Sequence, residues 1–325
     1  MLKSLLSSLL MMCATVVVYA DDDDSYAHHP KSALFIEKMV NKHGFDRNYL
    51  ERLMAGAMRK QSILDAISRP AEKTKSWKQY RKIFLTKKRT EQGREFIYLY
   101  ANALKRAERE FGVPKEIIAA IIGVETSYGR NKGSYRVVDA LATLGFDYPP
   151  RSQFFSKQLE EFLLLVKEQK FDAEKVKGSY AGAMGYGQFI PSSYRSFAID
   201  FDGDGVADII NNPVDAIGSV ANYFKSEGWR TGEMVTSPAS VSANYNSDLA
   251  NKKLKPKHSY AQLREDGYLA SVALSDDVMV TPLRLKGRDG DEHWLGLKNF
   301  YVITRYNHSR LYAMAVYQLS ETFKQ

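Results

Sequence analysis

The segment 114–129 predicts a helix with one strongly apolar face, which a stable fold has to bury. Four of its side chains fall at positions i, i+3, i+4 and i+7: Ile118, Ile121, Ile122 and Glu125. The carboxylate therefore continues the stripe that the isoleucines bury. Gly112 ends the preceding helix, Pro114 begins this one, and Gly129 ends it shortly after Glu125. Burial of an unpaired carboxylate on such a face destabilises the fold, so its presence there indicates a function.

Two effects are expected to raise the pKa of Glu125. The apolar stripe desolvates the carboxylate, and the negative end of the helix dipole lies close to it. A carboxylic acid that stays protonated near neutral pH can protonate a glycosidic oxygen. The alternative at this point is a surface glutamate, or one paired with Arg130, because glutamates are common at helix ends.

The N-terminal segment Met1–Ala20 predicts a signal peptide. Lys3 gives a basic start, an apolar run follows, and small residues precede a cleavage point before Asp21. The expected location is the periplasm. The chain's one cysteine, Cys13, lies in this segment, so the mature chain has no internal disulfide. Acylation of Cys13 is the alternative and would place the protein at the outer membrane, although Met12 stands where lipoprotein signals carry a small residue.

The 325-residue chain carries a formal charge of +8, which falls by one when Lys3 is removed. A basic surplus favours an anionic partner through long-range attraction. No helix-turn-helix, zinc knuckle or aromatic RNA-binding signature accompanies it, which argues against nucleic acid. For an exported protein, an anionic cell-wall polymer is the expected partner.

Composition predicts a mainly α protein of the α+β class. Ser32 and Asp46 are the expected caps of two short helices, a long helix is expected over 91–111, and the apolar stretch 311–323 is expected to pack on the N-terminal helices. The run 278–285 with a turn at Asp289–Gly290 predicts a hairpin. The predicted division is a signal peptide 1–20, an acidic stub 21–31, a helical domain 32–111 plus 297–325, a core 112–232 and a small antiparallel β domain 233–296.

The segment 178–189 is rich in glycine, carries two tyrosines and leads into a helix start at Pro191. Small residues let the backbone approach a ligand closely, and its polar groups can then bind sugar hydroxyl and N-acetyl groups. The spacing fits neither a phosphate loop nor a dinucleotide fingerprint, and no organic cofactor is expected. A tight helix–helix crossing is the alternative reading.

Residues 200–208 match the first nine positions of an EF-hand calcium loop. The loop supplies acids, a turn glycine and a carbonyl ligand in the expected order: Asp200, Asp202, Asp204, Gly205, Val206 and Asp208. Asn211 stands at position 12, where a bidentate Glu is expected, and Asp215 follows on the next helix. Either Asp208 or Asp215 would then complete a structural Ca²⁺ site within 200–215. An Asp-Gly turn without metal is the alternative.

These features, in this order, resemble the lytic murein transglycosylase B family of Slt35-like glycosidases. The matching segments are residues 123–130, 179–193, 215–224 and 299–307. The resemblance implies a lysozyme-like catalytic core that holds the active site and the Ca²⁺ loop. The loop is one residue longer before Asp215 than the family pattern.

The resemblance also implies an activity. It is the cleavage, without water, of the β-1,4 bond between N-acetylmuramic acid and N-acetylglucosamine in peptidoglycan, which leaves 1,6-anhydromuramic ends. Glu125 would act first as acid and then as base. Ser179 and Gln188 resemble sugar contacts, and four further residues resemble cleft-lining positions: Tyr80, Arg151, Tyr223 and Tyr306. Partners would be peptidoglycan glycan strands and proteins of cell-wall synthesis or division.

Two other functions compete with this one. A hydrolytic lysozyme needs a second carboxylate, for which Asp139 is the candidate closest in sequence. Its place in an apparently helical run instead predicts a cap or surface group. A non-catalytic, Ca²⁺-stabilised peptidoglycan-binding protein would carry the same charge and tyrosines.

Overall fold

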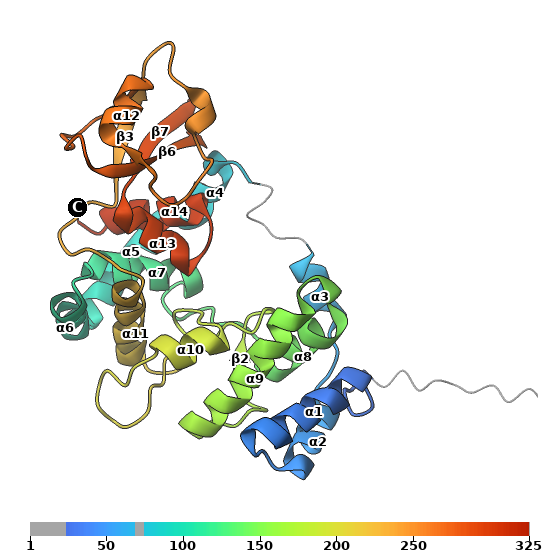
Figure 1. Ribbon diagram of the computed structural model, residues 1–325. Coiled ribbons are helices and arrows are strands. Elements are labelled where there is room, and N and C mark those ends of the chain that lie inside the picture. Colours follow the sequence, from blue (N-terminus) through green and yellow to red (C-terminus); the bar gives the residue numbers. More distant parts are fainter. Residues whose placement is uncertain (1–23, 69–74, 325) are drawn as a thin grey trace, which may run out of the picture.

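The computed structural model describes residues 24–68 and 75–324 (Figure 1). The predicted signal segment 1–20, with Cys13, lies outside the described residues. No helix within residues 24–68 and 75–324 is long and apolar enough to cross a membrane.

Most of the described chain is helical. The α-helices are α1 Pro30–His43, α2 Arg47–Gly56, α3 Gln61–Ile67, α4 Trp77–Phe84, α5 Lys87–Leu99, α6 Ala101–Phe111, α7 Lys115–Thr126, α8 Val137–Asp147, α9 Ser152–Gln169, α10 Pro191–Phe197, α11 Pro213–Ser226, α12 Tyr260–Glu265, α13 Lys298–Tyr306 and α14 Arg310–Glu321. The strands are β1 Tyr135–Arg136, β2 Lys177–Gly178, β3 Thr236–Val241, β4 His258–Ser259, β5 Tyr268–Ala270, β6 Met279–Lys286 and β7 Asp291–Gly296. The predicted class, α+β with helices predominant, is confirmed.

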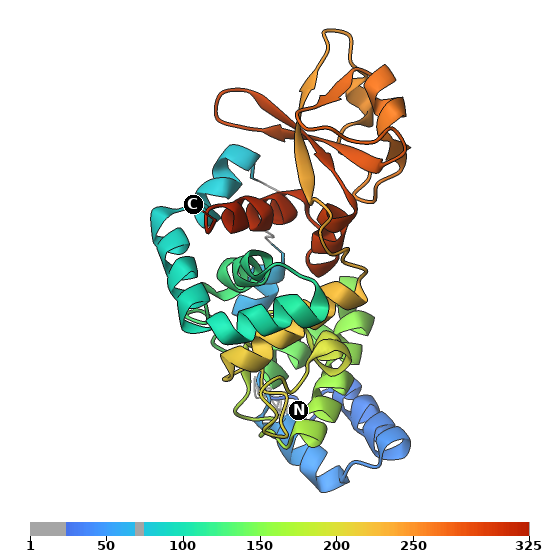
Figure 2. The same ribbon diagram turned by 90° about the vertical axis from the view of Figure 1, so that its left-hand side faces the viewer.

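Helix α7 lies at the centre of the helical part. Ile118, Ile121 and Ile122 are fully buried, as the stripe predicted. The helix packs against α5, α6, α11 and α14. Figures 1 and 2 show α13 and α14 between the β sheet and α7. The C-terminal helix therefore contacts α7 as well as the N-terminal helix α4.

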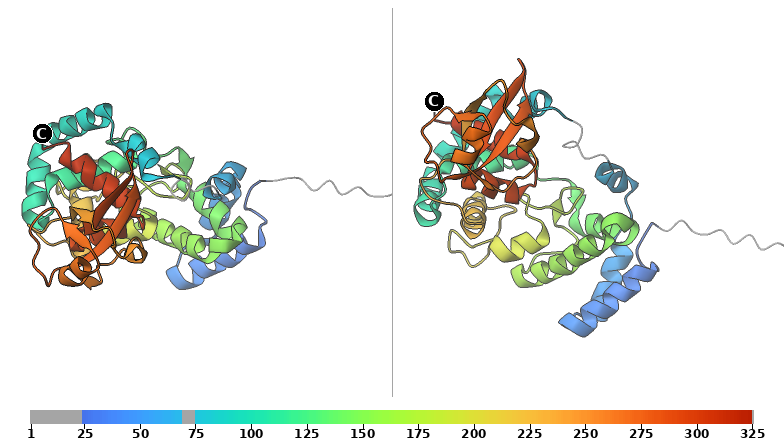
Figure 3. Two further views of the ribbon diagram at one scale, coloured as in Figure 1. Left: turned by 90° about the horizontal axis from the view of Figure 1, so that it is seen from above. Right: turned by 45° about the horizontal axis from the view of Figure 1, so that its top comes forward.

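The small sheet has the antiparallel order β4-β6-β7-β3-β5. Strand β6 is buried on both faces: Val280 belongs to a small core of the sheet's own, whereas Leu283 and Leu285 belong to the main core. The predicted hairpin is confirmed, because β6 pairs with β7 and the Gly287 amide donates to Gly290 across the turn. The views in Figures 1 to 3 place the sheet at one end of the molecule and α1 and α2 at the other. The predicted domain boundaries stay predictions.

Two predicted helix boundaries are wrong. His29 is the N-cap of α1, which begins at Pro30, and its ring accepts a hydrogen bond from the Lys31 amide, whereas Ser32 is fully buried inside the helix. The expected single helix 91–111 is two helices, α5 and α6, that meet at Tyr100. The Tyr100 ring packs on Phe96 with 4.8 Å between centroids, and its backbone leaves the helical region. The predicted Asp46 cap is confirmed, since its carboxylate accepts the Tyr49 amide.

A buried carboxylate, Glu160 on α9, joins this helix to the end of α1. Glu160 is 5% exposed and accepts from Lys42 at 2.9 Å, from His43 at 2.7 Å and from Lys38. Burial alone would raise the pKa of Glu160, but the hydrogen bonds from these basic partners outweigh it and lower the pKa to about 2. The ionised carboxylate is therefore the form that holds α1 against α9.

Replacing Glu160 by Gln is expected to lower the free energy of unfolding at neutral pH by about 2 kcal/mol. A depressed folded-state pKa contributes stability that is present above the unfolded-state value and lost as pH falls toward about 2. The difference between the two proteins should therefore shrink across that acidic range in urea titrations. Glu37→Gln, at an ion pair whose Glu37 side chain is 51% exposed, is the control and should change stability far less. Equal effects of the two changes would refute a special role for Glu160.

Candidate active site

Glu125 lies in the last turn of α7 and is half-buried. Ser127 and Tyr128, with φ of 52° and 60°, turn the chain sharply after Thr126. The Arg89 guanidinium donates to the Gly123 carbonyl in the same turn. The carboxylate is thus held at the C-terminal end of a helix whose middle is apolar and buried, as the sequence predicted.

Tyr312, in the first turn of α14, donates a hydrogen bond to Glu125 Oε1 over 2.6 Å. The Tyr312 ring is buried and stacks on Tyr306, with 6.4 Å between centroids and 9° between planes. Burial, reinforced by the nearby Glu125 charge, raises the pKa of both phenols well above the ordinary value. Both tyrosines therefore remain protonated donors beside Glu125.

Arg130, the possible ion-pair partner of Glu125, and Asp139, the possible second catalytic carboxylate, both have other contacts. Arg130 forms an ion pair with Glu95, with 3.6 Å between nitrogen and oxygen. Asp139 is only 4% exposed, accepts the Met58 amide at 3.0 Å and lies 3.5 Å from an Arg136 nitrogen. The expectation that Asp139 is a cap or surface group is wrong, because its carboxylate fixes backbone 81 residues away in the sequence. Its carboxylate therefore has a structural role in joining α8 to the segment after α2.

The segment 178–189 forms a tight loop rather than a helix crossing, and antiparallel bridges join Met184 to Gly178 and to Phe189. The Ser179 hydroxyl accepts the amides of Ala181 and Ala183. Gln188 adopts a positive φ of 51° and donates its side-chain amide to the Gly185 and Lys132 carbonyls. Both predicted sugar contacts therefore lie half-buried on one braced loop.

A glycine in this loop lets Tyr306 approach the backbone. The Tyr306 hydroxyl donates to the Gly187 carbonyl at 2.5 Å. A Cβ atom on Gly187 would lie 2.7 Å from that hydroxyl, so a side chain here would displace the tyrosine. Because Tyr306 stacks on Tyr312, the loop is connected to Glu125 through two aromatic rings.

Of the other predicted cleft residues, two tyrosines lie near Tyr306 and Tyr312, and Arg151 does not. Tyr223 contacts Tyr306 edge to face at 4.8 Å and donates to the Arg305 carbonyl. Tyr80, buried on α4, is close enough to Tyr312 to influence its pKa. Arg151 is not brought into this group: it is exposed, and its guanidinium lies 4.3 Å from the centre of the Phe154 ring. The substrate roles of all three stay predictions.

The predicted calcium loop brings three carboxylates together. Oxygen atoms of Asp200, Asp202 and Asp204 lie within 4.8 Å of one another. Backbone amides, first that of Gly205, lower the pKa of Asp200. These exposed carboxylate oxygens fit a hard cation.

The remaining predicted ligands have protein partners. The Val206 carbonyl accepts the Asp208 amide at 3.1 Å. Asp215 is fully buried and lies outside the cluster of three carboxylates. Its two oxygens accept the amides of Phe201 at 2.7 Å, Asp202 at 3.3 Å and Asp208 at 2.8 Å. Asp215, in the first turn of α11, therefore holds the loop through backbone amides. Its role as a metal ligand stays a prediction.

Tyr312 is the site residue that the sequence interpretation missed. It lies in the stretch 311–323, which was assigned only to packing, and 187 residues separate it from Glu125. The available signal was its position six residues after Tyr306, at a helix start capped by Ser309.

The chain is similar to known proteins over most of its length. Residues 27–321 match the family model described as the transglycosylase SLT domain. The chain is 46% identical over 305 residues to membrane-bound lytic murein transglycosylase B of Escherichia coli (strain K12), covering 91% of this chain and 83% of that protein.

Three solved structures have the same fold. Soluble lytic transglycosylase SltB1 of Pseudomonas aeruginosa superposes with a TM-score of 0.87 at 54% identity, covering 90% of this chain and 98% of that one. Escherichia coli Slt35 in complex with calcium gives 0.85 at 46% identity, covering 92% and 94%. Pseudomonas aeruginosa SltB3 in complex with NAG-anhNAM-pentapeptide gives 0.82 at 30% identity, covering 90% and 78%. The chain therefore belongs to the transglycosylase SLT domain family and is a lytic transglycosylase.

Proposed function

We propose that the enzyme cleaves the β-1,4 bond between N-acetylmuramic acid and N-acetylglucosamine in peptidoglycan, with Glu125 as its single acid and base. The observation that carries this proposal is the hydrogen bond from the Tyr312 hydroxyl to Glu125 Oε1 at the end of a buried apolar helix. The complex of the related SltB3 with NAG-anhNAM-pentapeptide supports both the substrate class and an anhydro product.

Glu125 would act twice in one turnover. Its proton passes to the glycosidic oxygen as the bond from that oxygen to the muramyl C1 breaks. The resulting carboxylate then takes the proton of the C6 hydroxyl while O6 bonds to C1, which restores the acid and closes the anhydro ring. The substrate's own N-acetyl group stabilises the intermediate cation, which replaces a second carboxylate. Because Tyr312 donates to Oε1, the transferred proton is favoured on Oε2.

The structural role of Asp139 supports this mechanism over hydrolysis. A lysozyme-type reaction needs a second carboxylate to activate water or form a covalent bond. Asp139 is buried against the Met58 amide and Arg136. Mass spectrometry of digested muropeptides tests the choice: anhydromuramic ends are expected, and reducing ends alone would establish hydrolysis.

The site residues named from the sequence form the proposed binding surface. Ser179 and Gln188 would contact the muramyl N-acetyl group and sugar ring, and the tyrosines would line the cleft: Tyr80, Tyr223 and Tyr306. Arg151 would contact substrate farther from Glu125.

We further propose a structural Ca²⁺ in the loop 200–215. Asp200, Asp202 and Asp204 supply carboxylates, and Val206 and Asp215 would join them after local adjustment. The calcium complex of the related Slt35 supports the choice of ion. The ion would brace the loop at the N-terminus of α11, away from the chemical step.

Calcium is expected to stabilise the protein without taking part in the reaction. At a free concentration of about 100 times Kd, it should add about 2.7 kcal/mol to the free energy of unfolding, which thermal melts would show as a higher Tm that EDTA reverses. Asp202→Asn should remove most of this increase because it removes one carboxylate charge. Asp248→Asn, at an exposed aspartate of the β domain, is the control and should keep it. A Tm that does not respond to calcium would refute the site.

The proposed location is the periplasm, after removal of the segment 1–20. The related Escherichia coli enzyme is named as membrane-bound, which supports a place in the cell envelope. Partners among cell-wall synthesis or division proteins are proposed on the same basis.

A further inference from the structure

A cavity of about 640 Å³ lies where the loop 251–255 faces the start of α14. Its wall carries the cationic side chains Lys252, Lys253, Lys255 and Arg310, together with His308. The described residues that line this cavity include no Asp or Glu. We call it the basic pocket. Its composition favours an anionic ligand.

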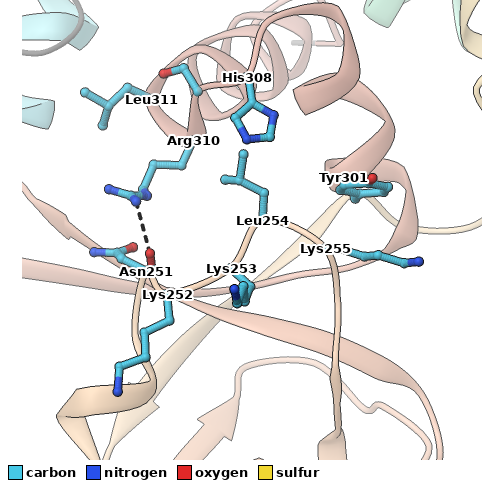
Figure 4. Close-up of a pocket in the computed structure, with 10 residues that line it drawn as sticks. Asn251, Lys252, Lys253, Leu254, Lys255, Tyr301, His308, Arg310 and Leu311 are labelled. Carbon is cyan, nitrogen blue, oxygen red and sulfur yellow. Dashed lines mark hydrogen bonds between the residues drawn. The ribbon is translucent and has the colours of Figure 1, made fainter.

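Arg310 has unused hydrogen-bonding capacity at the wall of the basic pocket. One terminal nitrogen donates to the Asn251 carbonyl at 3.1 Å, as Figure 4 shows. Its Nε is buried and has no partner among the described residues. Burial lowers the pKa of Arg310. Arg310 forms no ion pair with an acid of the described residues, so its charge favours a carboxylate in the pocket.

The charges are spread over the pocket rather than focused on one point. In Figure 4, Lys252 and Lys255 extend in different directions, His308 lies above Leu254, and the Arg310 guanidinium lies to the left of Leu254, beside Asn251. This arrangement suits an extended ligand with several anionic groups better than a single small ion. The adjoining cavity, which shares Lys255 and Tyr301, also carries the acids Glu233 and Asp277. The net positive charge is therefore concentrated in the basic pocket.

The basic pocket and Glu125 are connected through one helix turn. Arg310 is the first residue of α14, and Tyr312, two positions later, donates to Glu125. Residues two apart on a helix point to nearly opposite sides, so the N-terminus of α14 separates the pocket from the acid. A helix with side chains is about 10–12 Å across, and an extended peptide of five residues spans up to about 17 Å. A peptide attached to a sugar beside Glu125 can therefore reach around α14.

We propose that the basic pocket binds carboxylate groups of the peptide stem on the glycan strand that Glu125 cleaves. The proposal rests on the proposed function, because it takes the substrate to be peptidoglycan. Binding there would hold the stem-bearing muramyl residue in register with Glu125, so that strands with carboxylate stems are preferred over bare strands.

The test measures binding to three forms of one glycan strand: with free-carboxylate stems, with amidated stems and with stems removed. Glu125→Gln is the background, so that no strand is cut. The pocket variant reverses three exposed charges: Lys252→Glu, Lys253→Glu and Lys255→Glu. The matched control reverses three exposed lysines on α5, α6 and β6: Lys88→Glu, Lys105→Glu and Lys286→Glu. Both variants carry the same change in net charge.

The pocket variant is expected to raise the Kd for carboxylate stems about tenfold or more, and the Kd for the other two strands at most about twofold. The control variant should change all three Kd values alike and slightly. Arg310→Gln should repeat the selective loss with one substitution. An equal loss on bare strands, equal loss in the control, or tight binding of amidated stems by the parent would each overturn the proposal.

Product analysis keeps this proposal separate from the proposed function. With Glu125 present, the pocket variant should still convert bare strands to anhydro ends at the parent rate. If the parent itself forms no anhydro ends, the proposed reaction fails, whereas the binding comparison still reports on the pocket.

Discussion

Glu125→Gln should reduce the rate of anhydromuramic-end formation by about 10³-fold or more. The amide keeps the size and shape of the side chain and can still accept the Tyr312 hydrogen bond. It can neither donate a proton to the glycosidic oxygen nor take one from the C6 hydroxyl, so both halves of the proposed reaction fail together. Initial rates on purified glycan strands, with products separated by chromatography, give the measurement.

Binding and stability show whether the loss is chemical. The Kd for strands and the Tm should stay close to those of the parent, because the change adds no cavity and removes no buried partner. Glu95→Gln, at an exposed glutamate that pairs with Arg130, is the matched control and should keep activity within about twofold. A Glu125→Gln enzyme that retained a tenth of the parent rate would contradict the assignment of Glu125 as the acid.

Tyr312→Phe should lower kcat by about 10- to 100-fold while the protein remains folded. The substitution keeps the ring that stacks on Tyr306 and removes the hydroxyl that donates to Glu125. That hydroxyl stabilises the carboxylate form, so its loss raises the pKa of Glu125. The alkaline limb of the pH–rate profile, where activity falls as the acid ionises, should therefore move to higher pH.

The shift of the alkaline limb shows whether the Tyr312 hydroxyl acts on Glu125 or only packs within the core. Tyr317→Phe, farther along α14 beside Trp294, removes a hydroxyl from the same helix and should leave the pH profile in place. A Tyr312→Phe enzyme with an unchanged profile, or a Tyr317→Phe enzyme with the same shift, would show that the Tyr312 hydrogen bond does not tune Glu125.

Local patterns predicted the parts of the fold that depend on neighbouring residues. The stripe that ends at Glu125, the Asp46 cap and the Asp289–Gly290 turn each follow from a few consecutive residues. The acids of the loop 200–208 do too, since their spacing alone brings three carboxylates together. Such features do not require knowledge of what packs against them.

The features that were missed depend on distant partners. Tyr312 reaches Glu125 only because α14 returns to pack on α7, and helical spacing within 311–323 cannot reveal that. Asp139 is buried, and its carboxylate accepts the Met58 amide from the segment between α2 and α3. Tertiary contacts decided both of these cases.

The most direct test of a water-independent reaction is digestion of peptidoglycan in water enriched with heavy oxygen, followed by mass spectrometry of the new muramyl ends. If the C6 hydroxyl is the nucleophile and Glu125 is its base, the ends are anhydromuramic, lighter than hydrolysis products by one water, and carry no heavy oxygen. New reducing ends that contain the label would show that water attacks C1, and would contradict the proposed role of Glu125 as the lone acid and base.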